Sequence, residues 1–113
     1  MANTFKVSTK ADLVTTAITD AATNVLTAAA GATHVLLSIL VSNKTGTSAD
    51  VDVYLVPNSG DSIYIIRNAP VPAGGALEII SGSKIIMEPS AVLRARADTG
   101  TTLDLSISYL EQT

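Results

Sequence analysis

The chain has 113 residues, the size of a single domain, and its 10 acidic and 7 basic side chains give a formal net charge of −3 at pH 7. Because binding to a phosphate backbone needs a basic face, this balance argues against nucleic acid as a partner. Cysteine is absent, so we expect neither disulfides nor thiolate metal sites.

The low charge favours self-association. Charged residues make up only 15% of the chain, against about 25% in typical soluble domains, while hydrophobic residues make up 47%. A small monomer has proportionally more surface than a large one and should be more polar. We therefore expect neighbouring subunits to cover part of this surface.

The apolar stretches are too short for a membrane span. The longest run, residues 35–41, is interrupted by Ser38, whereas a helix needs about 20 apolar residues to cross a bilayer. The first residues, MANTFK, lack the basic and then apolar layout of a signal peptide. We expect no membrane partner, and the missing cysteines fit synthesis in a reducing compartment.

The first 30 residues are ambiguous. Residues 1–12 carry Phe5 and Val7 among polar residues and form either a short strand or an N-terminal arm that reaches a neighbour. Residues 11–30 mix alanine, which favours helix, with threonine, valine and isoleucine, which favour strands. We predict two strands, at residues 13–18 and 23–28, with a helix as the alternative.

The most apolar strand is predicted at residues 33–43. Because side chains alternate between the two faces of a strand, one face is assigned to the core and the other to the outside. The core face holds Val35, Leu37, Ile39 and Val41. The outer face holds His34, Leu36, Ser38, Leu40 and Ser42.

The rest of the chain alternates in short segments between turns. Strands are predicted at residues 50–56, 62–68, 77–80, 84–88, 92–97 and 103–110. Clusters of Gly, Pro, Asn and Ser mark turns at residues 29–32, 43–46, 57–60, 72–75, 81–83, 88–90 and 98–100. This pattern predicts an all-β fold, an antiparallel β-sandwich of the jelly-roll type, as one domain over residues 13–113.

Many large apolar or aromatic side chains fall on faces assigned to the outside. This number of outward apolar side chains suggests a contact patch between subunits. The alternative is that some of them are buried because the assigned register slips by one residue. The predicted interface residues are Leu36, Leu40, Tyr54, Val56, Tyr64, Ile66, Ile80, Ile86 and Leu110.

No catalytic, cofactor or metal site is predicted. His34 is the only histidine, and no spacing assembles a triad or ligand set around it, so we interpret it as a histidine near a turn. Asp50 and Asp52, with Asp61, could offer oxygen ligands to calcium. No calcium loop with its glycine and terminal glutamate follows them, and solvated acids are the expected state.

Glu78 and Glu88 could be imagined as an acid/base pair on neighbouring strands. Paired carboxylates act in this way only in a cleft that shifts their pKa. Because Lys84 and Arg94 are expected nearby on the same outward faces, we predict cross-strand ion pairs instead.

Four segments together resemble a group of small bacteriophage virion proteins. They are VSN at residues 41–43, YLVPNSGDS at 54–62, VPAGGALEIISGSKIIMEPSAVLRARADTG at 71–100 and SISYLE at 106–111. The resemblance covers residues 33–111 and lies in the pattern of turns and strand lengths. It implies a structural role without catalysis, as a capsid cement or decoration protein or as a neck or tail component.

The leading hypothesis is therefore a cement or decoration protein of the virion, made in the host cytoplasm. It would assemble as a homo-oligomer, for example a trimer, and contact the major capsid protein or another virion protein. The second hypothesis is a carbohydrate- or receptor-binding module, such as a tail or fibre head. That function predicts exposed Tyr54 and Tyr64 beside a shallow pocket with Asp or Asn neighbours. An enzyme would need one pocket that holds His34 and a carboxylate.

Overall fold

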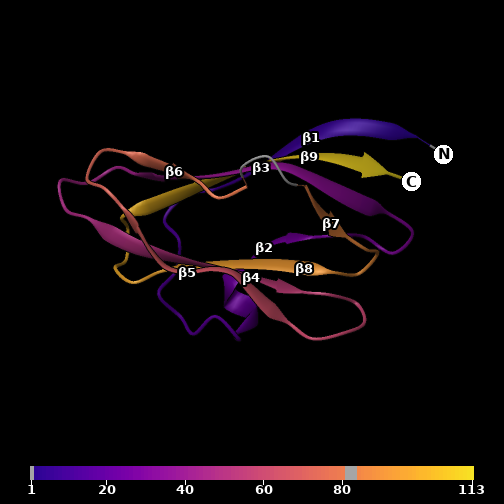
Figure 1. The fold of residues 1–113 in the computed structure, drawn as a ribbon, viewed down its shortest axis with the longest axis horizontal. Coiled ribbons are helices and arrows are strands. Elements are labelled where there is room, and N and C mark those ends of the chain that lie inside the picture. The colour runs from indigo at the N-terminus through magenta and orange to yellow at the C-terminus, as the bar shows by residue number, and fades with distance from the viewer. Residues whose placement is uncertain (1, 81–83) are drawn as a thin grey trace.

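The computed structural model describes residues 2–80 and 84–113, and within them the chain forms nine strands and one short 3₁₀ helix (Figure 1). The elements, in chain order, are β1 (Asn3–Lys10), η1 (Ala21–Thr23), β2 (Asn24–Thr27), β3 (Thr33–Asn43), β4 (Ala49–Val56), β5 (Ile63–Val71), β6 (Ala76–Glu78), β7 (Ile85–Met87), β8 (Val92–Ala97) and β9 (Leu103–Gln112). The turn expected at residues 81–83 lies outside the described residues. No helix in the described ranges has the length and apolar character needed to cross a membrane.

The strands form two antiparallel sheets packed face to face, the upper and lower layers of Figure 1. The first sheet has the order β1-β9-β3, with β6 and β7 both paired to the far edge of β3, and the second has the order β2-β8-β4-β5. The pairs are nested: β1 with β9, β2 with β8, β3 with β6 and β7, and β4 with β5. Such a long hairpin rolled into two sheets is a jelly roll, which confirms the predicted fold class.

The core lies between the sheets and is supplied by alternate residues of each strand. In β8 and β9 the predicted alternation is confirmed, because every second side chain is buried while its neighbours are partly exposed. The buried set of these two strands is Leu93, Ala95, Ala97, Leu103, Leu105, Ile107 and Tyr109. The turn at residues 72–75 depends on its glycines, since Gly74 has a φ of 66° and a Cβ on Gly75 would lie 2.8 Å from Cγ of Pro72.

A β-bulge in β3 exchanges its two faces halfway along the strand. Leu36 lies opposite Tyr109 and Ser38 lies opposite Ser108, so Leu37 is an extra, unpaired residue. Ile39 and Val41 beyond the bulge are buried as predicted. Before the bulge the assignment was wrong, because His34 and Leu36 are buried while Val35 and Leu37 are only half-buried.

Two other residues assigned to the outside also face the core. Irregular register in the β4–β5 pair places Ile66 opposite the buried Val53, and Ile66 packs against the core. β6 ends at Glu78, so strict alternation does not extend to Ile80, which is buried in the core. Leu36, Ile66 and Ile80 were therefore assigned to the wrong face and belong to the core, as the alternative of a slipped register allowed.

The N-terminal residues form an edge strand. β1 pairs with β9 along its whole length, from Asn3 opposite Gln112 to Lys10 opposite Leu105, so residues 3–10 do not form a free arm in this chain. The strand predicted at residues 13–18 is absent, whereas β2 lies inside the second predicted strand. The connection between β1 and β2 instead passes over the end of the sandwich, where Leu13 is buried in the core.

Candidate functional site

The outer face of the first sheet carries an apolar row that crosses four strands. Phe5 lies opposite Leu110, Leu110 opposite Val35, and Val35 opposite Ile86. Directly opposed residues of antiparallel strands point to the same side, and their side chains are in contact distance. These four residues, called the apolar row below, therefore form a continuous strip from β1 to β7.

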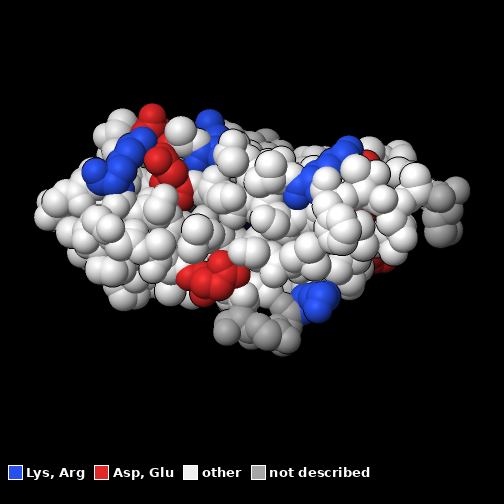
Figure 2. Space-filling model, turned by 90° about the horizontal axis from the view of Figure 1, so that it is seen from above, with Lys and Arg blue, Asp and Glu red and all other residues white. Residues whose placement is uncertain are grey.

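This face exposes apolar side chains to an unusual extent. Phe5 is 78% exposed, Val7 63% and Ile86 53%. Figure 2 looks onto this side of the molecule and shows a broad area without charge, with charged side chains scattered around it. A surface of this kind on a small domain is typical of a contact site.

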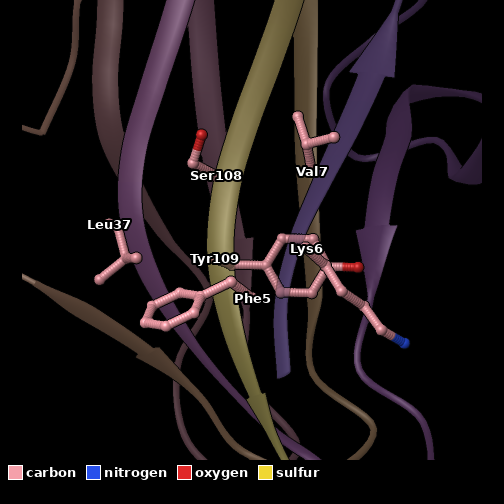
Figure 3. A pocket seen from close by; sticks show the side chains of 6 residues that line it. All are labelled: Phe5, Lys6, Val7, Leu37, Ser108 and Tyr109. Carbon is pink, nitrogen blue, oxygen red and sulfur yellow. The ribbon is translucent and has the colours of Figure 1, made fainter. Parts of the chain in front are cut away.

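The same face is also hollowed. One hollow of about 330 Å³ lies among Phe5, Val7, Leu37 and Ser108, and in Figure 3 the Phe5 ring reaches over β9 to the side of Leu37. A second hollow of about 270 Å³ lies farther along the sheet, and its wall combines Leu40 and Leu105 with the charged Lys10 and Asp104. Hollows between raised side chains can receive the side chains of a facing surface.

Ion pairs lie at the two ends of this sheet. Lys6 Nζ is 2.8 Å from Glu111 Oε1, and this hydrogen bond, followed by that from His34, lowers the pKa of the Glu111 carboxyl. At the other end Lys44 pairs with Asp12 and Asp104. The backbone N–H of Asp12, followed by Lys44, lowers the pKa of the Asp104 carboxyl. These ion pairs involve none of the four residues of the apolar row.

The outer face of the second sheet has a different character. A cross-strand row runs from Tyr64 to Tyr54 to Arg94 to Asn24. The two tyrosine rings meet edge to face, with centroids 5.0 Å apart. Arg94 Nε donates to Asn24 Oδ1 at 2.8 Å, so this row is aromatic at one end and polar at the other.

The connection between β1 and β2 covers part of this face, below the lower sheet in Figure 1. Arg96 Nε donates to the carbonyl of Thr16 at 2.9 Å and Nη2 to that of Thr15 at 3.1 Å, while Arg94 Nη1 donates to that of Thr19 at 2.9 Å. Arg96 Nη1 is also 3.0 Å from Oδ2 of the buried Asp52. Two arginines of β8 thus hold the loop in place through hydrogen bonds to its carbonyls.

The predicted interface residues divide between the two outer faces. Leu40, Ile86 and Leu110 lie on the first sheet, and Tyr54, Val56 and Tyr64 on the second. Sequence reasoning missed four residues that complete the first face: Phe5, Val7, Val35 and Leu37. Phe5 and Val7 had a signal, since they alternate with polar residues as strand residues do, whereas no pattern marks the bulge that turns Val35 and Leu37 outward.

His34 follows the turn at residues 29–32, as expected, and its side chain is buried. Its Nε2 lies 3.1 Å from Glu111 Oε2, and its ring centroid lies 4.5 Å from that of Tyr109. Nδ1 is buried without a hydrogen-bond partner among the described residues. The ring fills the end of the core behind Lys6 and Glu111 and adjoins neither hollow of the first sheet.

The acidic candidates do not converge. Asp52 is not solvated as expected, because it binds Arg96 and accepts from the backbone N–H of Asn68 at 2.6 Å. The cross-strand ion pairs predicted for Glu78 and Glu88 with Lys84 and Arg94 are not among the ion pairs of the described residues. Glu78 belongs to the first sheet and accepts from Ser38 Oγ at 2.9 Å, whereas Arg94 belongs to the second. Residues 2–80 and 84–113 contain no group of three or more His, Cys, Asp or Glu placed to hold a metal ion.

No protein-family model matches this chain, and no curated protein matches its sequence. The function is therefore inferred from the chemistry of the two outer faces.

Proposed function

We propose that this chain is a non-enzymatic structural protein of a bacteriophage virion, a capsid cement or decoration protein. It acts as a homo-oligomer, with a trimer as the expected size, and contacts the major capsid protein or another virion protein. The observation that carries the proposal is the apolar row with its exposed Phe5 and Ile86. Jelly rolls serve as capsid domains and as lectins, so the fold is compatible with this function without selecting it.

The outer face of the first sheet supports a stable interface in both size and character. The molecule measures 45 × 25 × 22 Å, so a broad face of the sandwich can supply the roughly 800 Å² per partner that specific interfaces bury. The apolar row lies beside the Lys6–Glu111 ion pair, and apolar contact area next to polar groups is usual in interfaces. Burial of Phe5 and Ile86 against a neighbour would therefore be the main source of affinity.

The test uses virus particles that lack this protein, mixed with the purified chain. We expect the wild-type chain to bind the particles and raise the temperature at which they lose their DNA. Phe5→Ser combined with Ile86→Ser should abolish binding. Ile63→Ser is the matched control, because Ile63 is the same residue type, is also 53% exposed, and lies on the second sheet. Failure of the wild-type chain to bind heads, together with binding to isolated necks or tails, would replace the cement role with a neck or tail role.

A second candidate function, receptor binding, is favoured by one observation. Tyr64 is 39% exposed and lines a hollow together with Asp52 and Asn68, the neighbours expected for a sugar-binding module. A glycan array probed with the labelled chain tests it. Binding to some glycan that is lost in Tyr64→Ala is the expected result, and a silent array would remove this candidate.

A further inference from the structure

All three arginines of the chain gather at the outer face of the second sheet. Arg94 and Arg96 project from β8, and Arg67 lies on β5 across β4 from them. Arg96 and Arg67 line the same hollow. The four lysines, at positions 6, 10, 44 and 84, belong to other parts of the chain. An acidic protein therefore presents a local concentration of guanidinium groups on one face.

Two of these arginines are already engaged. Arg94 and Arg96 hold the loop carbonyls of Thr15, Thr16 and Thr19, and the charge of Arg96 is balanced by Asp52. Arg67 differs, because it forms no ion pair with any carboxylate in the described part of the chain. Its guanidinium carbon lies 5.0 Å from the centroid of the Tyr64 ring. Stacking of this kind restrains the guanidinium and leaves its in-plane N–H donors free.

The free guanidinium borders a hollow of about 320 Å³ between the loop and β5. Its wall includes Ile18 and Thr19 from the loop and Tyr64 and Asn68 from β5. This volume is at the lower end of the range for small-molecule sites, about 300–1,000 Å³. The hollow thus combines an aromatic ring, an aliphatic side chain, a hydroxyl, an amide and a cation.

Asp52 fixes the positions of two polar residues that line this hollow, Asn68 and Arg96. Asn68 has a φ of 51°, a left-handed conformation that asparagine tolerates, and its backbone N–H donates to Oδ1 of Asp52. The other oxygen of Asp52 binds Arg96, which in turn holds the loop. Asp52 is the single acid among the described residues that line the hollow, and Arg96 neutralises it, so the charge of Arg67 is uncompensated there.

We propose that this hollow binds an acidic saccharide, a sugar that carries a carboxylate, as uronic and sialic acids do. The Arg67 fork matches a carboxylate through two parallel N–H···O bonds. The amide of Asn68 and the hydroxyl of Thr19 suit sugar hydroxyls, and Tyr64, which is 39% exposed, offers the apolar surface that the C–H face of a sugar ring requires. The proposal deepens the receptor-binding candidate and is independent of contacts at the apolar row.

The test is an NMR titration of the ¹⁵N-labelled full-length chain with sodium glucuronate and with N-acetylneuraminate. We expect saturable shifts confined to residues 17–19 and 64–68. Glucose and sodium sulfate should bind with an affinity at least about tenfold lower, because glucose lacks the charge and sulfate lacks the sugar ring. Shifts of equal size with sulfate would show that small anions suffice, and no shift with either acidic sugar would overturn the site itself.

Two variants locate the effect. Arg67→Lys keeps the charge but loses the planar fork, and it should weaken binding of the acidic sugar by about tenfold. Lys84→Gln removes an exposed cation elsewhere on the chain and should leave binding unchanged. Equal binding by Arg67→Lys and wild type would contradict the assigned role of Arg67. Glycan-array signals for neutral sugars alone would sustain receptor binding while refuting the acidic ligand.

Discussion

At the scale of single residues, Arg96 connects the β1–β2 loop to the second sheet. It holds two loop carbonyls and the carboxylate of Asp52, which is itself 6% exposed. Nothing in the sequence marks this role beyond the Arg94–Arg96 spacing, because the partners Thr15 and Thr16 are about 80 residues away in the chain. Long-range polar contacts of this kind follow from the topology and leave no local pattern.

Arg96→Gln should therefore destabilise the fold. Loss of the guanidinium leaves Asp52 without its charge partner and frees the loop, and we expect a loss of about 2–3 kcal/mol in the free energy of unfolding. Urea denaturation followed by circular dichroism measures it. Arg67→Gln, in the exposed arginine of the same face, should change stability by less than about 0.5 kcal/mol. A similar loss in both variants would show that Arg96 does not act through its contacts.

The Glu111 carboxyl makes the free energy of unfolding depend on pH, and the direction of its pKa shift gives the sign. Hydrogen bonds from Lys6 and then His34 lower the pKa of its carboxyl in the folded chain. A lowered folded-state pKa contributes stability that is present above the unfolded value, about 4.3 for glutamate, and is lost as the pH falls through the folded value. Asp104, whose pKa is also lowered, acts in the same direction.

We therefore expect the urea midpoint of the wild-type chain to fall more steeply below about pH 4.3 than that of Glu111→Gln. Glu88→Gln is the control, since Glu88 is exposed and forms no ion pair within the described ranges. Parallel curves for wild type and Glu111→Gln between neutral pH and about pH 3 would refute the contribution of this carboxyl.

At the scale of elements, regular strands could be predicted and irregular ones could not. β8 and β9 follow the strict alternation that the sequence predicted for residues 92–97 and 103–110. β3 has equally apolar residues on both sides of its bulge, and hydrophobicity alone cannot locate the residue that is left unpaired. β1 could be recognised as a strand or an arm, and its pairing with β9 depends on a partner at the far end of the chain.

The bulge in β3 predicts different losses of stability when two neighbouring leucines are replaced. Leu36→Ala should cost about 2–5 kcal/mol because it leaves a cavity in the core, whereas Leu37→Ala should cost less than about 1 kcal/mol. Both are measured by urea denaturation in the background of Phe5→Ser combined with Ile86→Ser, so that a subunit contact does not contribute. Strict alternation through β3 would give the opposite order, and a larger loss for Leu37→Ala would show that the bulge is misplaced.

At the scale of the whole molecule, the two faces of the sandwich divide the surface chemistry. The first sheet presents the apolar row, and the second presents tyrosines and arginines. Composition alone indicated a covered surface, since charged residues make up only 15% of the chain. It could not say which face exposes the apolar side chains, because Phe5 and Leu110 become neighbours only when the two ends of the chain pair.

The most direct measurement is light scattering on the purified chain across a concentration series, with Phe5→Ser combined with Ile86→Ser and, as control, Ile63→Ser. We expect the wild-type chain and Ile63→Ser to form the same oligomer, of trimer mass, and the double variant to be a folded monomer by circular dichroism. A wild-type chain that stays monomeric at every concentration would contradict the subunit contact at the apolar row. The same conclusion would follow if the double variant kept the oligomer while Ile63→Ser lost it.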